Sequence, residues 1–225
     1  MAPGCKNPGV FLCKLDGKHK KIAALPRLRL QQLTCKRLES LDLDIGAAQI
    51  VCLSGASGSG KSTLLRAIAD LDPHQGQVWL DDREQNSVAP PQWRSWIGML
   101  AAESLWWFDS VKPHFARLEQ EWLEMLGFEL RVLDWQVSRL SSGERQRLAL
   151  LRLLSHTPRA LLLDEPSANL DAENTKRIEA LIQHYADYYQ APVLWISHDA
   201  DQIARVAQRH YRLEAGRLVR QEMSL

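Results

Sequence analysis

The chain has 225 residues, of which 45% are hydrophobic and 24% are charged. This length suits one domain with a substantial core, or one domain that carries a small insertion. The 28 lysines and arginines nearly balance the 27 aspartates and glutamates, for a net charge of +1. That balance argues against a protein that binds nucleic acid mainly through a basic surface.

No apolar run reaches the roughly 18 residues that a membrane-spanning helix needs, and the lysine-containing first 25 residues lack an apolar stretch of signal-peptide length. We therefore expect the chain to stay in the cytosol. Cys5, Cys13, Cys35 and Cys52 form no C-x-x-C pair, which favours reduced thiols over disulfides. A metal site made of Cys5, Cys13 and His19 is an alternative, but its spacing matches no known ligand pattern.

The elements expected in chain order alternate between strands and helices. Residues 1–25, with several prolines and glycines, are expected to form a flexible leader, and attraction to an anionic membrane is the alternative. Alternating apolar residues predict strands around 28–30 and 41–45. Later strands are expected at 50–54, 77–80, 97–100, 160–163 and 193–196, helices at 62–70, 113–127, 141–154, 173–189 and 199–207, and a hairpin at 211–219. This order implies a largely parallel sheet in an α/β fold.

A glycine-rich segment follows the apolar strand 50–54 and opens the next helix. It fits the pattern G-x-x-x-x-G-K-[ST] of a P-loop, with the residues Gly55, Ala56, Ser57, Gly58, Ser59, Gly60, Lys61 and Ser62, followed by Thr63. Glycines let backbone N–H groups wrap a phosphate, and the helix dipole adds attraction for the anion. Lys61 would bind the β- and γ-phosphates, and the Ser62 hydroxyl would ligate Mg²⁺.

Two adjacent carboxylates, Asp164 and Glu165, end the apolar strand 160–163. Asp164 would hold Mg²⁺ directly or through water, while Glu165 would orient or deprotonate an attacking water. An acidic pair that merely begins a helix before Pro166 is the alternative, and the P-loop elsewhere in the chain disfavours it.

A capped helix start is expected at Ser141, because Glu144 stands three residues later as in a capping box. A helix N-terminus that also contains Gly143 provides a second place where a phosphate would bind.

With these motifs in this order, the chain resembles the ATP-binding-cassette (ABC) ATPases from about residue 28 to residue 216. The resemblance rests on the P-loop, the signature at 140–144, the Asp164-Glu165 pair, the D-loop at 167–171, and the segment 196–199 that contains His198. It implies a P-loop core with a mostly parallel sheet, an N-terminal antiparallel β subdomain and a short inserted helical subdomain. The implied domains are an ATP-binding core at 26–103 and 136–225, and a helical subdomain for partner docking at 104–135.

The resemblance also implies a head-to-tail dimer, with ATP between the P-loop of one subunit and the signature of the other. Glu165 would be the catalytic base, with Lys61 and His198 at the γ-phosphate in cis. Across the interface, the implied contacts come from the signature and the D-loop, namely Ser141, Ser142, Gly143, Glu144 and Asp171. The resemblance implies Mg²⁺ as cofactor.

The chain departs from the family pattern in three places. Ala102 stands where the family has a glutamine at the end of the strand 97–100, so we consider the next residue, Glu103, as a substitute metal ligand. No Phe, Trp or Tyr lies between residues 11 and 79 to stack on adenine, so Lys36 or Arg37 would cover the base and ATP and GTP would be poorly distinguished. Ser142 replaces a glycine with little added bulk.

Six of the eight tryptophans lie within residues 93–135. One interpretation is a small local core. The other is that some of them are exposed and form the docking site for a membrane partner. Burial of Trp106 and Trp107 would distinguish the two.

The favoured hypothesis is an ATPase subunit, paired with itself or with a paralogous subunit, that drives a separate membrane-spanning permease and lies on the inner face of the cell membrane. Residues 161–199 look most similar to the ATP-binding subunit of bacterial iron-export systems. One alternative is a degenerate subunit that binds nucleotide beside an active partner. A soluble ABC-type ATPase acting on nucleic acid or the ribosome is disfavoured by the single cassette. A GTPase is disfavoured because the guanine-reading N-K-x-D motif is absent.

Overall fold

The computed structural model describes residues 27–222. The expected leader at 1–25 and the candidate ligands Cys5, Cys13 and His19 lie outside the described residues. Cys35 and Cys52 are buried free thiols, as the cysteine spacing predicted.

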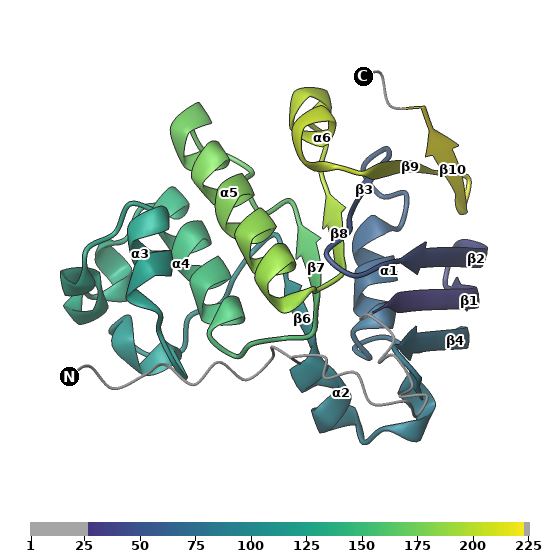
Figure 1. The fold of residues 1–225 in the computed structure, drawn as a ribbon, viewed down its shortest axis with the longest axis horizontal. Coiled ribbons are helices and arrows are strands. Elements are labelled where there is room, and N and C mark those ends of the chain that lie inside the picture. Colours follow the sequence, from purple (N-terminus) through teal and green to yellow (C-terminus); the bar gives the residue numbers. More distant parts are fainter. Residues whose placement is uncertain (1–26, 223–225) are drawn as a thin grey trace, which may run out of the picture.

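A four-stranded antiparallel sheet holds the first strands in the order β2-β1-β4-β5 (Figure 1). Its strands are β1 (Leu28–Cys35), β2 (Leu38–Ile45), β4 (Gln75–Leu80) and β5 (Arg83–Glu84). Alternating leucines face the core, since Leu28, Leu30 and Leu33 are each at most 2% exposed. The antiparallel β subdomain is therefore confirmed.

A six-stranded sheet forms the centre of the molecule in the order β10-β9-β3-β8-β7-β6. Its strands are β3 (Ile50–Ser54), β6 (Ile97–Leu100), β7 (Ala160–Asp164), β8 (Val193–Ile196), β9 (Arg209–Glu214) and β10 (Arg217–Gln221). All neighbours pair in parallel except β9 and β10, which form the expected hairpin. Strands β7 and β8 are buried along their whole length, as in sheets that are covered on both faces.

Two groups of buried side chains cover the two faces of this sheet. Helices α3, α4 and α5 lie on one side, and α1 with the antiparallel sheet lies on the other (Figure 1). The α-helices are α1 (Lys61–Ile68), α2 (Pro90–Trp96), α3 (Gln120–Met125), α4 (Ser142–Leu154), α5 (Ala172–Tyr189) and α6 (Ala200–Val206). Short 3-10 helices are η1 (Gln85–Ser87), η2 (Lys112–His114), η3 (Leu130–Asp134) and η4 (Val137–Arg139). Within residues 27–222, none of the helices combines the length and the apolar character needed to cross a membrane.

In the tryptophan-rich region, one expected helix is much shorter than predicted and another helix was missed. The helix expected at 113–127 is only α3, because the chain is extended at Phe115 and again at Glu119, where α3 begins. Helix α2 was not expected at all, although Pro90 at its first position is a common helix start. The buried side of α2 consists mainly of Trp93, so the sequence of residues 90–96 shows little of the apolar periodicity that predicts a helix.

The tryptophans divide between the two interpretations. Trp93 and Trp122 are 0% and 6% exposed and belong to the core, and Trp106 is partly buried against it. Trp107 is 63% exposed and lies between Leu105, 81% exposed, and Phe108, 47% exposed. A local core and an exposed aromatic surface are therefore both present.

Replacing Trp93 with alanine should lower the free energy of unfolding by about 3–5 kcal/mol. The indole is fully buried, and its Nε1 donates a hydrogen bond to the Ile68 carbonyl over 2.9 Å. The same change at exposed Trp107 should cost about 1 kcal/mol or less. Urea denaturation of both variants measures the difference, and equal losses would contradict the burial described here.

Candidate nucleotide and catalytic site

Three adjacent parallel strands, β3, β8 and β7, bring the sequence motifs to one edge of the central sheet. Leu53 of β3 and Asp164 of β7 both pair with Ile196 of β8, so the three strands end at the same level. The P-loop leaves β3, the acidic pair ends β7, and His198 follows β8. The carboxyl edge of a parallel sheet is where α/β proteins bind ligands.

At three positions of the P-loop the backbone has a positive φ angle, a conformation that glycine adopts more easily than other residues. Gly55, Gly58 and Gly60 have φ angles of 145°, 74° and 108°. A side chain at Gly55 would also lie 2.7 Å from the Leu213 carbonyl oxygen of β9. The loop therefore fits closely against β9 and leads directly into α1.

Lys61, the first residue of α1, is only 7% exposed and folds back over the loop. Its Nζ donates to the carbonyl oxygens of Gly55 and Ala56, over 2.8 and 3.0 Å. Burial lowers the pKa of the Lys61 ammonium, and the nearby Glu165 and Asp164 carboxylates oppose that shift. A buried cation therefore lies between the loop and the acidic pair.

The two carboxylates at the end of β7 lie in different surroundings. Asp164 is 7% exposed, whereas the Glu165 side chain is 35% exposed. Glu165 has a φ of 50°, a left-handed conformation that turns the chain sharply after the strand. The Glu165 Oε1 lies 2.9 Å from the Nε2 of His198. The structure thus brings Lys61, Asp164, Glu165 and His198 together.

The surroundings of Asp164 suit a hard divalent cation that also binds phosphate. Among the described residues, no hydrogen bond or ion pair reaches this buried carboxylate, although Lys61 lies close enough to interact with it electrostatically. The described residues contain no group of three or more His, Cys, Asp or Glu side chains arranged to hold a metal. Mg²⁺ needs only one or two protein ligands when substrate phosphates and water complete its shell, so Asp164 and the Ser62 hydroxyl fit it.

The signature segment lies at the start of α4, on the other side of the central strands from α1 (Figure 1). Ser141 caps α4 in a complete capping box, with its Oγ accepting from the Glu144 N–H over 3.2 Å. Between the described residues, no hydrogen bond or ion pair joins Ser141, Ser142, Gly143 or Glu144 to the P-loop. Gly143 instead lies against Leu170 of the D-loop.

Asp171 ends the D-loop and caps α5. Its carboxylate accepts from the backbone N–H and from the side-chain amide of Asn174, each over 2.7 Å. These hydrogen bonds, the backbone one first, hold the pKa of Asp171 below its usual value. Gly143 of the signature thus lies against the D-loop, and D-loop residues 167–170 line a cavity of about 280 Å³ together with Glu165 and His198.

Gln202 is a buried residue near the site that the sequence analysis did not identify. It is 2% exposed, its Oε1 accepts from the Ser197 hydroxyl over 2.9 Å, and its Nε2 lies 2.8 Å from the Ser167 Oγ. It thus joins the loop that contains His198 to the D-loop. The only sequence signal was its place in the first turn of α6, after the capping residue Asp199.

Two of the predicted departures are visible in the structure. Glu103 is exposed and follows β6, whose Leu100 pairs with Leu163 of β7, so it leaves the sheet beside the acidic strand. Lys36 and Arg37 form the two-residue turn between β1 and β2, and both line a cavity of about 200 Å³ with the P-loop residues Gly58 and Gly60.

Comparisons with known proteins agree with this architecture. The family described as "ABC transporter" matches residues 38–168. The lipoprotein-releasing system ATP-binding protein LolD of Saccharophagus degradans is 33% identical over 205 residues, which cover 82% of this chain and 89% of that protein. The aliphatic sulfonates import ATP-binding protein SsuB 3 of Pseudomonas syringae pv. syringae is 36% identical, covering 80% and 68%.

The molybdenum import ATP-binding protein ModC of Methylococcus capsulatus is 32% identical over 80% of this chain, which spans 54% of that longer protein. Among solved structures, a dimer of the ATP-binding cassette MJ0796 with ADP and Pi has a TM-score of 0.75 at 23% identity, covering 88% of this chain and 99% of that chain. An Atm1-family ABC exporter with ATP bound has a TM-score of 0.76 at 20% identity, covering 91% and 40%. These likenesses confirm the fold.

The glycine-rich loop, the acidic pair and the order of the motifs, together with these relatives, place the chain in a defined family. It belongs to the ABC transporter family as an ATP-binding subunit, an ATPase whose hydrolysis of ATP is coupled to transport.

Proposed function

We propose that this subunit works as a head-to-tail dimer that hydrolyses ATP with Glu165 as base and drives a separate membrane-spanning permease. The observation that carries the proposal is the meeting of Lys61, Asp164, Glu165 and His198 at one sheet edge. Among the described residues, the signature residues 141–144 form no hydrogen bond or ion pair with the P-loop of the same subunit, and Gly143 lies against Leu170 of the D-loop.

The first step is capture of the triphosphate by the P-loop. Backbone N–H groups at the start of α1 face the anion, as is typical of this loop. The Lys61 ammonium would exchange the carbonyl oxygens of Gly55 and Ala56 for phosphate oxygens of higher negative charge. Ala56, Ser57, Ser59 and Thr63 complete the predicted phosphate-binding segment.

Mg²⁺ would be held by Ser62 and Asp164, and when bound it neutralises charge on the phosphates. Glu103 is proposed as an additional ligand in place of the side chain that Ala102 lacks, because it leaves the strand next to Asp164.

Water attack depends on Glu165 in this proposal. His198 Nε2 lies 2.9 Å from one carboxylate oxygen, Oε1, and holds the carboxylate in place. The other oxygen, Oε2, is then available to take the proton of an attacking water. His198 would also contact the γ-phosphate, and Gln202 would position the His198 loop through Ser197.

The second half of the site would come from another subunit, a copy of this chain or a paralogue. The start of α4, with Ser141, Ser142, Gly143 and Glu144, would bind the phosphates of an ATP held by the P-loop of that other subunit. Asp171 would link the two sites of the dimer. The solved MJ0796 cassette is itself a dimer with ADP and Pi bound, which supports this arrangement.

A permease would dock where apolar side chains are exposed beside the central sheet. A groove of about 490 Å³ runs between α1, α2 and the end of α4, and Leu71, Met99 and Leu153 line it. Next to Leu153, Arg152 donates to the Leu105 carbonyl over 2.8 Å and lies 4.7 Å from the ring centre of Trp107. The groove and the aromatic segment 105–108 thus flank one helix end, as a continuous docking surface would.

The chain would then lie at the cytoplasmic face of the membrane through its permease. The helical subdomain at 104–135, whose boundaries stay a prediction, would provide most of the contact. The three relatives are named for lipoprotein release, molybdenum import and sulfonate import. Iron export rests only on the resemblance of residues 161–199 and stays a prediction.

A second candidate is a nucleotide-binding subunit with impaired hydrolysis that works beside an active paralogue. Ala102 is the observation that favours it, because an alanine provides no ligand for the metal. The Glu165–His198 contact favours the active enzyme.

Replacing Glu165 with glutamine should reduce phosphate release by at least about 100-fold, because the amide cannot accept the water's proton. In the presence of ATP this variant should then accumulate as a dimer, which light scattering or gel filtration would detect. Glu121→Gln, a matched change at an exposed glutamate of α3, should leave both measurements unchanged. Wild-type turnover in Glu165→Gln, or failure of ATP to produce a dimer, would contradict the proposal.

Glu103 can be tested by two substitutions that separate its charge from its oxygen. Glu103→Ala should reduce ATP turnover strongly and raise the Mg²⁺ concentration needed for half-maximal rate. Glu103→Gln should retain most of the turnover, since its amide oxygen remains a ligand. If both variants match the wild type across a Mg²⁺ titration, Glu103 does not replace the missing glutamine.

Replacing Trp107 with alanine should weaken binding to the permease by about 10-fold or more, as expected for an exposed aromatic anchor. ATP turnover of the isolated subunit should not change. Tyr188→Ala, which removes a similarly exposed aromatic from the end of α5, is the control. Co-purification with the membrane subunit measures the effect, and equal recovery of both variants would exclude this surface.

A further inference from the structure

Arg147, in the second turn of α4, is a partly buried cation that follows shortly after the signature segment. Side chains of a helix lean toward its N-terminus, and the Arg147 Nε accordingly donates to the Gly143 carbonyl oxygen over 3.4 Å. The Nη1 group donates to the Leu126 carbonyl oxygen at the end of α3 over 2.6 Å, and the guanidinium carbon lies 4.5 Å from the ring centre of Phe128. One side chain therefore joins the start of α4 to the end of α3.

The end of α3 leaves one buried carbonyl group for this hydrogen bond. Gly127 has a φ of 75°, and its N–H and the N–H of the next residue both donate to carbonyls in the last turn of α3, each over 2.9 Å. This pair of hydrogen bonds ends a helix in a Schellman motif, which does not use the carbonyl of the residue before the glycine. That residue is Leu126, which is 0% exposed, and among the described residues Arg147 is the donor to its carbonyl. Without Arg147 this buried group would be unpaired.

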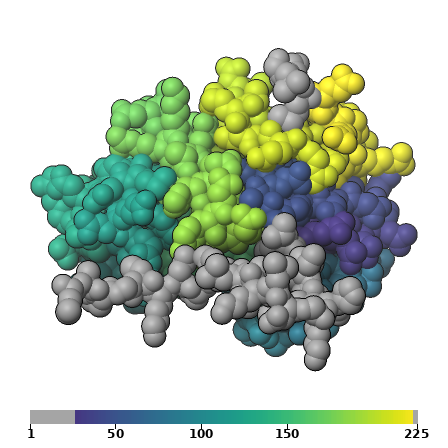
Figure 2. Space-filling model, viewed as in Figure 1, coloured from purple at the N-terminus to yellow at the C-terminus, as the bar shows by residue number. Residues whose placement is uncertain are grey.

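A second arginine approaches the same turn from α5. A side chain at Gly127 would collide with the guanidinium of Arg177, and Arg177 itself pairs with Glu173 in the first turn of α5. Figure 2 shows the teal atoms of the region around α3 beside the green atoms of α5, and the two helices are in contact. The turn after α3 is therefore held from α4 and from α5, the helices that begin at the signature and at the D-loop.

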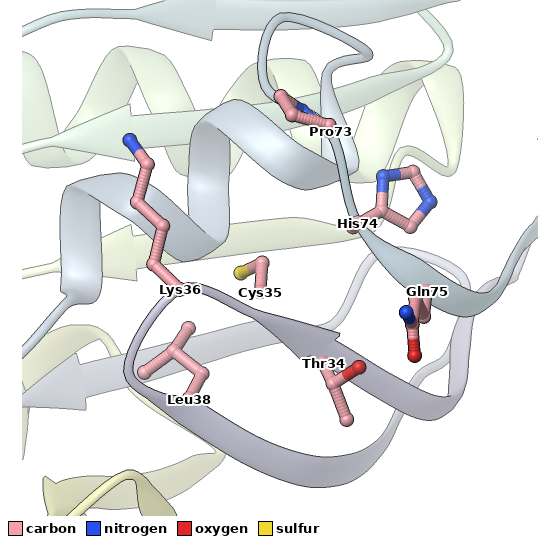
Figure 3. Close-up of a pocket in the computed structure, with 7 residues that line it drawn as sticks. All are labelled: Thr34, Cys35, Lys36, Leu38, Pro73, His74 and Gln75. Atoms are coloured by element: carbon pink, nitrogen blue, oxygen red, sulfur yellow. The ribbon is translucent and has the colours of Figure 1, made fainter.

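Arg147 lacks the carboxylate partner that a cation near the P-loop has. Lys36 lines the cavity of about 430 Å³ in Figure 3, and its Nζ donates to Asp72 over 3.0 Å. The hydrogen bonds of Arg66 and Lys36 lower the pKa of Asp72 to about 2, so its carboxylate stays ionised at neutral pH and offsets both cations. Among the residues that the structure describes, no carboxylate forms an ion pair or a hydrogen bond with Arg147, whose acceptors are backbone carbonyls.

The charge of Arg147 instead acts on three carboxylates near the starts of α4 and α5. Burial lowers the pKa of the Arg147 guanidinium, and the Glu144 carboxylate opposes that shift. Asp171 and Glu173 also oppose it. An arginine stays charged in such surroundings. Arg147 therefore offsets the repulsion with which these carboxylates would meet a phosphate at the start of α4.

We infer that Arg147 is a positioning residue of the signature, which fixes the start of α4 against the end of α3 and keeps that helix start attractive to the phosphate of an ATP held by the other subunit. The inference rests on the proposed function, because it takes the signature to act across the dimer. Arg147 acts through the backbone to which it donates, and not by touching the phosphate. Its loss should consequently leave ATP binding to the P-loop of its own subunit intact and impair the step that joins two subunits.

The first test measures ATP binding, dimer formation and turnover in the full chain carrying Arg147→Met, which keeps a long apolar stem but removes the charge and the donors. The kcat should fall by about 10-fold or more, as expected when hydrogen bonds from a charged group are lost. The Kd of the monomer for ATP should change by less than about twofold, because the P-loop is intact. With Glu165→Gln added to prevent turnover, ATP should produce less dimer than it does with Glu165→Gln alone.

Two further variants separate this effect from a general loss of charge. Arg147→Lys should recover part of the turnover, because an ammonium keeps the charge but not the planar fork of donors. Arg83→Met, the same change at an exposed arginine of β5, should leave turnover unchanged. Wild-type turnover and dimer formation in Arg147→Met would overturn the inference.

Mixing two impaired variants distinguishes action across the dimer from an effect within one subunit. In a mixed dimer of Arg147→Met and Lys61→Ala, one site combines an intact P-loop with an intact signature, so turnover should rise above that of either variant alone. A mixture of Gly143→Asp, which adds a carboxylate to the signature, with Lys61→Ala sets the recovery to be expected. Lys61→Ala mixed with Glu165→Gln is the negative control, because both changes affect the same half of the site.

The outcomes of the mixing experiment separate the inference from the proposed function. Recovery with Gly143→Asp but not with Arg147→Met would overturn the inference, since Arg147 would then act on the P-loop or the folding of its own subunit. If neither mixture recovers turnover, the signature does not act across a dimer, and the proposed function itself is wrong.

Discussion

The parallel register of β3, β8 and β7 is the constraint on which the rest of the site depends. Leu53, Ile196 and Asp164 lie at one level across three strands, so the loops that follow them start at the same edge. Each strand is short and completely buried up to its last residue. A shift of one residue in any strand would turn its apolar side chains over and separate the phosphate-binding loop from the carboxylates.

At this sheet edge, the effect of burial on the Lys61 charge is opposed by the two nearby carboxylates. Lys61 is a buried cation whose pKa is lowered by desolvation, and two carboxylates of different exposure oppose that shift. Its ammonium donates to carbonyl oxygens of its own loop. Binding a triphosphate would exchange neutral acceptors for charged ones, so the site does not need to create a cation when the ligand arrives.

Most of the fold was predictable because it depends on local patterns. Strand Ile50–Ser54 and the start of α4 at its Ser141 cap follow from apolar periodicity and capping chemistry. The short helix α3 and the unexpected α2 were not. The backbone is extended at Phe115 and Glu119 within the helix that was expected, and α2 is held by Trp93, whose indole donates to the distant Ile68 carbonyl. The site followed a similar division. The loop and the acidic pair carry sequence motifs. Gln202, in contrast, acts through partners that are distant in sequence, and only the structure shows that the Lys36 Nζ donates a hydrogen bond to Asp72.

Gly216, in the turn between β9 and β10, lies against the Arg37 carbonyl of the β1–β2 turn, and its own carbonyl accepts from the Glu39 N–H over 3.0 Å. This contact bears on the order in which the molecule forms during synthesis. The chain emerges from its N-terminus, so the phosphate loop is made long before the hairpin that supports the β1–β2 turn. Contacts between such distant segments form late and slowly. A nascent chain therefore has its phosphate loop before the hairpin that contacts the β1–β2 turn, and the turn gains this support only when the last strands have folded.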